Sequence, residues 1–154
     1  MGQENVDDFK LMLKDPAAAW AKAERDRAAM LSASAADLHK QFATLLTPTD
    51  AAVMTGAVAE HLAFCVRDGL APGVEGWGED GKAMAQPWGF AVTGITVPVL
   101  LMHGREDQFV PFGHGEWLAA RIPGVEARLL DHDGHLTLTE SRIGEVHAWL
   151  LSRL

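Results

Sequence analysis

A short apolar run that ends in a charged turn constrains this chain more than any other feature. The sequence VPVLLMHGREDQFVP, from Val97 to Pro111, begins with a nearly continuous apolar stretch that Gly104 ends. The stretch is too short for a typical buried helix and is rich in strand-forming residues, so it predicts a β-strand covered on both faces. Asp107 lies in the turn that follows. Because ligands of α/β proteins bind outside the carboxyl ends of parallel strands, Asp107 is a candidate functional acid.

A second apolar run places a histidine in a similar position. Residues Val125 to Leu130 predict another strand, and His135 follows it within a few residues. A helix predicted from about Gly113 to Ile122 lies between the two strands. An acid and an imidazole therefore each follow a strand, and a helical segment separates them.

These segments together resemble the C-terminal part of the α/β-hydrolase fold. HGREDQFVP followed by LAARIPGVEARLLDHDGHLTL is similar to the pattern in which the acid of a Ser-His-Asp triad follows one late strand and the histidine follows the next. The resemblance covers roughly Pro87 to Leu154. It implies an α/β fold class, a partial α/β-hydrolase fold that is mostly helical, with about two parallel strands and a helical cap region.

The resemblance also implies roles for individual residues. Asp107 matches the triad acid, which would accept a hydrogen bond from the histidine and fix its tautomer. His135 matches the triad histidine, which would act as the general base. Read without the resemblance, Asp107 is a turn residue that caps local amides, and His135 lies in a loop near a helix start.

Three aromatic residues are candidates for substrate binding in the hydrolase interpretation. They are Trp88, Phe90 and Phe109. For Trp88 and Phe90, a place in the hydrophobic core is an equally good interpretation.

The sequence contains no nucleophile of the kind this family uses. In the family the nucleophile lies in G-x-S-x-G, upstream of the acid. None of the four serines has glycines at that spacing, and neither does Cys65. The serines are Ser32, Ser34, Ser141 and Ser152. The early strands of the sheet are also absent, so we expect an incomplete hydrolase, weakly active or inactive alone, that would act on a small-molecule ester if an N-terminal half completed it.

The first half of the chain predicts helices and resembles the family's helical cap. We expect helices over about 4–13, 17–31, a segment capped by Ser34, and 50–68. Asp15 is expected to cap the second of these, with Pro16 in its first turn. Glycines then dominate residues 69–86, which predicts a loop.

Two regions follow from this pattern. Residues 1–86 form a helical cap-like region with a glycine-rich return loop, and residues 87–154 form the C-terminal α/β-hydrolase core segment. Within the core segment, a last helix is expected from about Glu140, because apolar residues then recur at helical spacing.

Composition excludes several kinds of partner. The net charge is −8, which argues against binding to nucleic acid or to an anionic membrane surface. The single cysteine fits a reducing compartment, and the acidic N-terminus has no apolar signal-peptide core, so we expect a cytoplasmic protein without a membrane span. We expect no cofactor and no metal.

Two other functions remain open. The chain could be a helical assembly module without chemistry of its own, because a two-stranded sheet is marginal alone and the strand after Val97 would present an unpaired edge. In that case we expect a homo-oligomer in which a second copy covers the edge across a two-fold axis. A weaker alternative is a metal site at His132 and His135, which lie with two aspartates in one turn.

Overall fold

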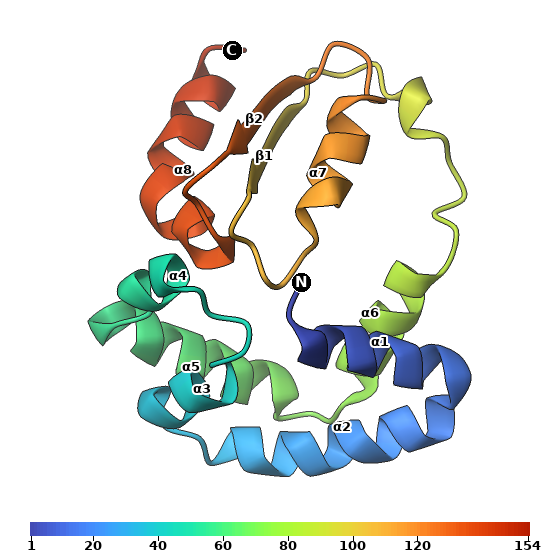
Figure 1. Cartoon of the computed structure of the whole chain (residues 1–154), viewed down its shortest axis with the longest axis vertical. Coiled ribbons are helices and arrows are strands. Elements are labelled where there is room, and N and C mark those ends of the chain that lie inside the picture. The colour runs from blue at the N-terminus through green and yellow to red at the C-terminus, as the bar shows by residue number, and fades with distance from the viewer. The chain divides into compact units, whose positions relative to one another are not determined.

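The computed structural model describes residues 1–154, and Figure 1 shows their arrangement. The chain has eight α-helices, one 3-10 helix and a two-stranded parallel sheet. The predicted fold class, mostly helical with two parallel strands, is therefore confirmed.

The chain separates into two compact units, which we describe one at a time. The helical unit consists of Gly2–Thr44 and Met54–Gly89. The strand unit consists of Met1, Leu45–Val53 and Phe90–Leu154. Residues 45–53 thus pack within the strand unit although they lie inside the region that we assigned to the cap.

The helical unit is built from five helices. They are α1 (Gln3–Lys14), α2 (Pro16–Leu31), α3 (Ala35–Gln41), α5 (Gly56–Leu70) and α6 (Glu75–Ala85). Helix α2 contacts α1 and α5, α3 contacts α5, and α1 contacts α6. The predicted caps are confirmed: Asp15 accepts a hydrogen bond from the Ala18 amide with Pro16 in the first turn, and Ser34 and Asp37 form a capping box.

Two predictions in this part of the chain are wrong. The helix expected over 50–68 is two helices, because Met54 and Thr55 interrupt it and Gly56 begins α5 with φ of +51°. Helix α6 lies in the segment that we predicted to be a loop. Its three glycines lower its intrinsic helix propensity, but two of them let the helix approach its neighbours: a methyl group at Gly78 would overlap the Trp20 ring, and one at Gly81 would lie 2.9 Å from the Met12 sulfur.

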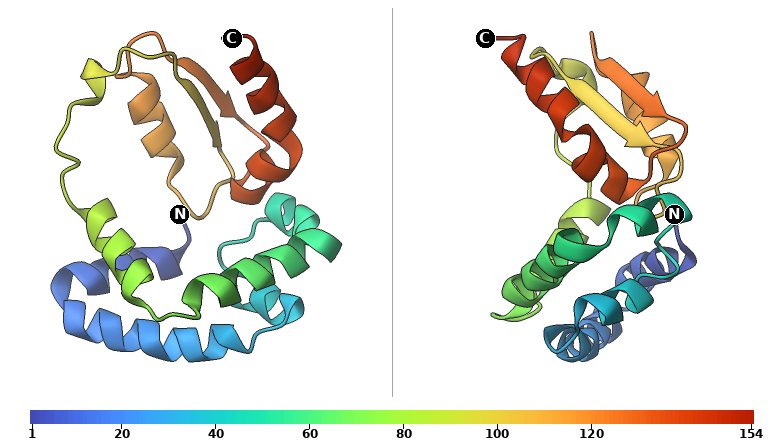
Figure 2. Two further views of the ribbon diagram at one scale, coloured as in Figure 1. Left: turned by 180° about the vertical axis from the view of Figure 1, so that it is seen from behind. Right: turned by 90° about the vertical axis from the view of Figure 1, so that its left-hand side faces the viewer.

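The strand unit contains the sheet and the helices that pack on it. Its elements are α4 (Pro48–Val53), the 3-10 helix η1 (Val92–Gly94), β1 (Leu100–Gly104), α7 (Phe112–Ala119), β2 (Glu126–Leu130) and α8 (His135–Leu151). Strands β1 and β2 run parallel, with Leu101 opposite Ala127. Helices α7 and α8 pack on opposite sides of the strands, which Figure 2 shows from two further directions.

The strands and the last helix differ from prediction in two ways. We expected a first strand covered on both faces, but only His103 and Gly104 of β1 are buried, because two strands and two helices cannot enclose the strand fully. We expected the last helix from about Glu140, but α8 already begins at His135. The cause is a set of hydrogen bonds to the first turn of α8, described below. None of the helices combines the length and the apolar character needed to span a bilayer.

Candidate functional site

Asp107 lies in the turn after β1, and its two carboxylate oxygens have different partners. Oδ1 accepts hydrogen bonds from the backbone amides of Phe109 and Val110, both at 2.8 Å. Oδ2 faces the imidazole of His135. The residue is 4% exposed, so water competes little for either oxygen. The carboxylate is therefore fixed in orientation by the turn and is directed toward one histidine.

His135 is the first residue of α8, and the structure brings it into contact with Asp107. Its Nδ1 lies 2.9 Å from Asp107 Oδ2, and its side chain is 42% exposed. The ring stacks on Phe109 with 4.7 Å between centroids and an interplanar angle of 25°. With the proton on Nδ1 donated to Asp107, Nε2 carries the lone pair. The arrangement gives a half-exposed imidazole a defined tautomer.

The pair perturbs the protonation of both members. The hydrogen bond that His135 donates to the Asp107 carboxylate raises the pKa of His135, against the opposing effect of burial. Burial acts to raise the pKa of Asp107, but the hydrogen bonds from His135 and from the two backbone amides outweigh it and lower that pKa. Both shifts favour the charged pair, in which a carboxylate faces an imidazolium.

A second histidine lies near the acid. His103 in β1 is 8% exposed, and its Nε2 lies 3.3 Å from the Val110 carbonyl oxygen and 3.6 Å from Asp107 Oδ2. Its ring packs edge-on against Phe112. We interpret His103 as a buried support for the turn, since its ring is covered while that of His135 is half exposed.

A buried acid that sequence reasoning missed also meets the site. Asp50 in α4 is 0% exposed, and its carboxylate accepts hydrogen bonds from the backbone amides of His135, Leu136 and Thr137. From the sequence, Asp50 was one of many acids near a predicted helix start. The glycine before His135 was a sequence signal for this contact, because it leaves room for the Asp50 carboxylate. The signal can be interpreted only with the structure, since Asp50 lies 85 residues before His135 in the chain.

The three aromatic candidates have different surroundings. Phe109 stacks on His135 and so lies directly beside the pair. Trp88 and Phe90 lie in the segment between α6 and η1, with exposed fractions of 60% and 61%. That exposure argues against a place in the hydrophobic core of this chain. A role of these two residues in substrate binding stays a prediction.

The acids of the turn before α8 are ion-paired with arginines. Asp131 contacts Arg105 at 2.9 Å, and Asp133 contacts Arg142 at 3.0 Å. No group of three or more His, Cys, Asp or Glu side chains in the chain is arranged to hold a metal ion. Ion pairs thus join this turn to the turn after β1 and to α8.

The serine and cysteine side chains whose hydrogen bonds are described bond to groups other than Asp107 and His135. Ser32 and Ser152 donate to carbonyl groups of their own helices, and Ser34 caps α3. Cys65 lies within α5, where its sulfur is 3.5 Å from His61 Nε2. No serine or cysteine is hydrogen-bonded to His135. The structure therefore assembles an acid and a histidine without a nucleophile bonded to them.

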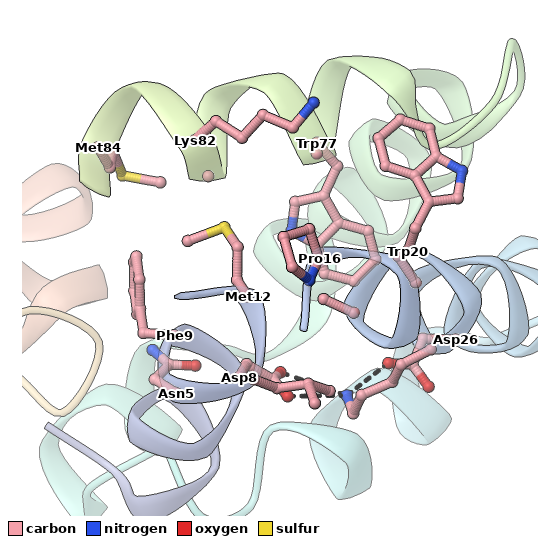
Figure 3. Close-up of a pocket in the computed structure, with 16 residues that line it drawn as sticks. Asn5, Asp8, Phe9, Met12, Pro16, Trp20, Asp26, Trp77, Lys82 and Met84 are labelled. Atoms are coloured by element: carbon pink, nitrogen blue, oxygen red, sulfur yellow. Dashed lines mark hydrogen bonds and ion pairs between the residues drawn. The ribbon is translucent and has the colours of Figure 1, made fainter. Parts of the chain in front are cut away.

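The helical unit contains a cavity that is separate from these residues. It has a volume of about 290 Å³ and lies among α1, α2 and α6, as Figure 3 shows. Phe9, Met12, Trp20 and Trp77 give it apolar walls. On one side, Lys22 is held between Asp8 and Asp26 at 3.1 and 2.6 Å. Lys22 balances one of the two negative charges, and the rest of the cavity wall is mainly apolar and aromatic.

Comparison with known proteins gives short matches. The pimeloyl-[acyl-carrier protein] methyl ester esterase of Aromatoleum aromaticum is 38% identical over 48 residues, which are 31% of this chain and 19% of that protein. The protein of the same name from Nitrosomonas europaea is 39% identical over 41 residues, 27% of this chain and 16% of its own length. The matched segments thus span less than a fifth of these relatives. No protein-family profile matches the chain.

Both curated relatives are α/β hydrolases. The resemblance to that family is confirmed over this short stretch. Among solved structures, an esterase (EaEST) from Exiguobacterium antarcticum aligns with 97% of this chain and 47% of its own, at 17% identity and a TM-score of 0.37. A similarity of that size adds no argument, so the esterase-like relationship depends on the sequence matches.

Proposed function

We propose that this chain supplies the acid and the histidine of a serine-type esterase whose nucleophile comes from another polypeptide segment. The observation that carries the proposal is the 2.9 Å contact between Asp107 Oδ2 and His135 Nδ1, in which the buried acid is oriented by two amides and the histidine is half exposed. The esterase names of the two curated relatives support an ester as substrate.

The chemistry follows from the tautomer. Asp107 accepts a hydrogen bond from the Nδ1–H group of His135, so Nε2 is free to accept the proton of a serine hydroxyl as the serine oxygen attacks the ester carbonyl. The imidazolium formed is stabilised by the carboxylate and then gives its proton to the departing alcohol. The departure of the alcohol leaves an acyl-serine. Water then attacks its carbonyl while the same nitrogen takes the water proton, and that proton passes to the serine oxygen as the acyl–serine bond breaks and the carboxylic acid leaves. These steps need no cofactor.

The proposal assigns parts to the rest of the chain. The helices before residue 87, apart from α4, serve as a cap-like region. Phe109, Phe90 and Trp88 contact the substrate, with Phe109 nearest the imidazole because of its stacking on His135. The single cysteine and the acidic charge support a cytoplasmic location. Alone, the chain has little activity, because a triad without its nucleophile keeps only a small part of its rate enhancement.

Hydrolysis of p-nitrophenyl butyrate tests the proposal. The purified chain should release p-nitrophenol no faster than a His135→Ala variant. Expressed together with the N-terminal half of an α/β hydrolase that carries G-x-S-x-G, it should turn over, and His135→Ala should reduce the rate by about 10³-fold or more. Turnover by the chain alone that disappears in His135→Ala would place a nucleophile inside it and contradict the proposal.

A second candidate function is homodimer assembly through β1, and the ladder geometry favours it. The carbonyl of Val99 and the amide of Arg105 bond to the β2 side. Because bonding alternates along a parallel ladder, the backbone groups of Leu100 and Met102 point away from β2, toward the open edge. Val97, just before the strand, is 66% exposed. A second copy would satisfy these groups across a two-fold axis.

A further inference from the structure

We propose that Asp50 is a positioning residue that holds His135 toward Asp107 through the first turn of α8. The inference rests on the proposed function, because it assigns Asp50 a role relative to the acid–histidine pair. The Asp50 carboxylate bonds the backbone amide of His135 rather than the imidazole, so it acts through the main chain.

The Asp50 carboxylate caps the N-terminus of α8, which has no side-chain cap at the preceding residue. The first amides of a helix lack intrahelical partners, and a side chain at the preceding residue usually satisfies them. In α8 the preceding residue is Gly134, which has no side chain. Asp50 Oδ2 accepts from the His135 amide at 2.8 Å, and Oδ1 accepts from the Leu136 and Thr137 amides at 2.9 and 3.1 Å. A distant acid thus takes the place of the local cap.

Gly134 is required by space rather than by backbone conformation. Its φ of −101° is open to any residue. A Cβ at this position would overlap the Asp50 carboxylate, so only glycine lets the acid reach the helix end. Thr137 completes the arrangement, because its hydroxyl oxygen accepts the Gly134 amide at 2.7 Å. The glycine before the histidine therefore has a physical explanation in Asp50.

The same segment of α4 also touches the turn that carries the acid. The Thr49 hydroxyl donates to the carboxylate of Glu106, the residue before Asp107. Thr49 is next to Asp50 in the chain, but it bonds Glu106 and neither member of the pair, so it is a suitable control position. Asp50 also adds a negative charge near the imidazole, which contributes to the raised pKa of His135 after the larger effect of Asp107.

The position of His135 explains why these bonds reach the imidazole. His135 is the first residue of α8, so bonds to its amide and the next two fix the direction in which its side chain leaves the backbone. Asp107 and Phe109 then set the ring within that direction. His103, the other titratable group nearby, contacts Asp107.

NMR of the whole chain tests the inference with four variants. Asp50→Asn keeps the shape and removes the charge, Gly134→Ala displaces the carboxylate, Thr49→Val is the matched control in the same helix, and Asp107→Asn is the reference for the pair. The readouts are the pH titration of the His135 ring and the low-field signal of its Nδ1 proton. Circular dichroism reports whether each variant folds.

We expect Asp50→Asn and Gly134→Ala to lower the pKa of His135 and to broaden the Nδ1 proton signal, by less than Asp107→Asn does. Thr49→Val should leave both readouts near wild type. A folded Asp50→Asn variant with an unchanged titration and an unchanged proton signal would make Asp50 a helix cap only and overturn the inference. If Asp107→Asn also leaves the titration unchanged, the proposed pair itself fails, which is a separate result.

If both Asp50→Asn and Gly134→Ala fail to fold, an NMR titration of the wild-type chain tests the inference instead. The carboxyl carbon of Asp50 is followed by ¹³C NMR during acid titration, together with the His135 ring. We expect the ring signals to show a step at the midpoint of the Asp50 carboxyl. A ring that responds at the Asp107 midpoint alone would overturn the inference.

Discussion

Asp107 combines the two interpretations that its sequence context left open. One oxygen caps the amides of Phe109 and Val110, as an ordinary turn aspartate does, and the other faces His135. The local capping therefore does not compete with a catalytic role. It orients the carboxylate so that the remaining oxygen is directed at the imidazole.

The pair should make stability depend on pH in a defined window. The folded-state pKa of His135 lies above its ordinary value of 6.5, so its contribution is complete below pH 6.5 and is lost as pH rises through the raised value. We expect the free energy of unfolding, measured with urea, to fall over that range in the wild type and to stay level in His135→Gln. His132→Gln is the control, an exposed histidine of the same turn, and should keep the decline. An unchanged decline in His135→Gln would contradict the pairing.

Asp107 should make the stability depend on pH in the acid range. The pKa of Asp107 is lowered in the folded state, so its contribution is present above the ordinary value of 3.8 and is lost as pH falls through the lowered value. The pair therefore stabilises the fold most between these two limits.

Removing the buried acid should weaken the fold. Asp50→Ala leaves three backbone amides at the start of α8 without their acceptor, and we expect the free energy of unfolding to fall by about 2–4 kcal/mol. Thr49→Val removes one hydrogen bond from the same helix and should cost about 1 kcal/mol. The free energies of unfolding are measured by urea denaturation. Equal decreases in Asp50→Ala and Thr49→Val would contradict the larger role given to Asp50.

Residues that the sequence identified are those whose signal is local. Asp107 and His135 each follow an apolar run, and the resemblance to the α/β-hydrolase pattern then implies their roles. Asp50 carries no such signal, because its role comes from a contact with α8 far along the chain. The start of α8 was misplaced for the same reason: the acceptor that allows the helix to begin at His135 lies outside the local sequence.

At the scale of elements, the structure departs from prediction where packing overrides propensity. Helices α2 and α3 have local caps at Asp15 and Ser34, and both were predicted. Helix α6 was not, because its glycines are typical of a loop. In the structure Gly78 faces Trp20 and Gly81 faces Met12, and the glycine pattern of the sequence gives no indication of these contacts.

Two glycine substitutions in α6 should have opposite effects. Gly78→Ala places a methyl group against the Trp20 ring and should lower the free energy of unfolding by roughly 1–3 kcal/mol. Gly76→Ala meets nothing within 4 Å and should raise it by about 0.5–1 kcal/mol through helix propensity. Thermal unfolding of both variants, followed by circular dichroism, gives the comparison. A stabilising Gly78→Ala would mean that α6 does not pack on α2 as described.

At the scale of the whole molecule, the two-stranded sheet leaves strand edges unpaired. Strand β1 has a partner on one side only, and its apolar residues Leu100, Leu101 and Met102 are half buried. Both proposals address this edge, since either an N-terminal half or a second copy would cover it. The resemblance to the family pattern implies further strands next to β1, but nothing within this one chain identifies what covers the edge.

Light scattering after size exclusion separates these two possibilities. If a second copy covers the edge, the wild type should have twice the monomer mass of 16.6 kDa. Met102→Pro removes an amide on the open edge while sparing the bonds to β2, and it should shift the mass to that of the monomer. A wild type that is monomeric over a wide concentration range would contradict the dimer.

The bond between Asp107 and His135 is the contact on which the proposed function depends most directly. The test is a pH titration of the His135 ring by NMR in the wild type and in Asp107→Asn, with Asp131→Asn as the control acid, because Asp131 pairs with Arg105 instead. We predict a wild-type pKa above the ordinary histidine value, a clear decrease in Asp107→Asn, and little change in Asp131→Asn. An equal pKa of His135 in the wild type and in Asp107→Asn would contradict the proposed function, because His135 would then have no acid partner.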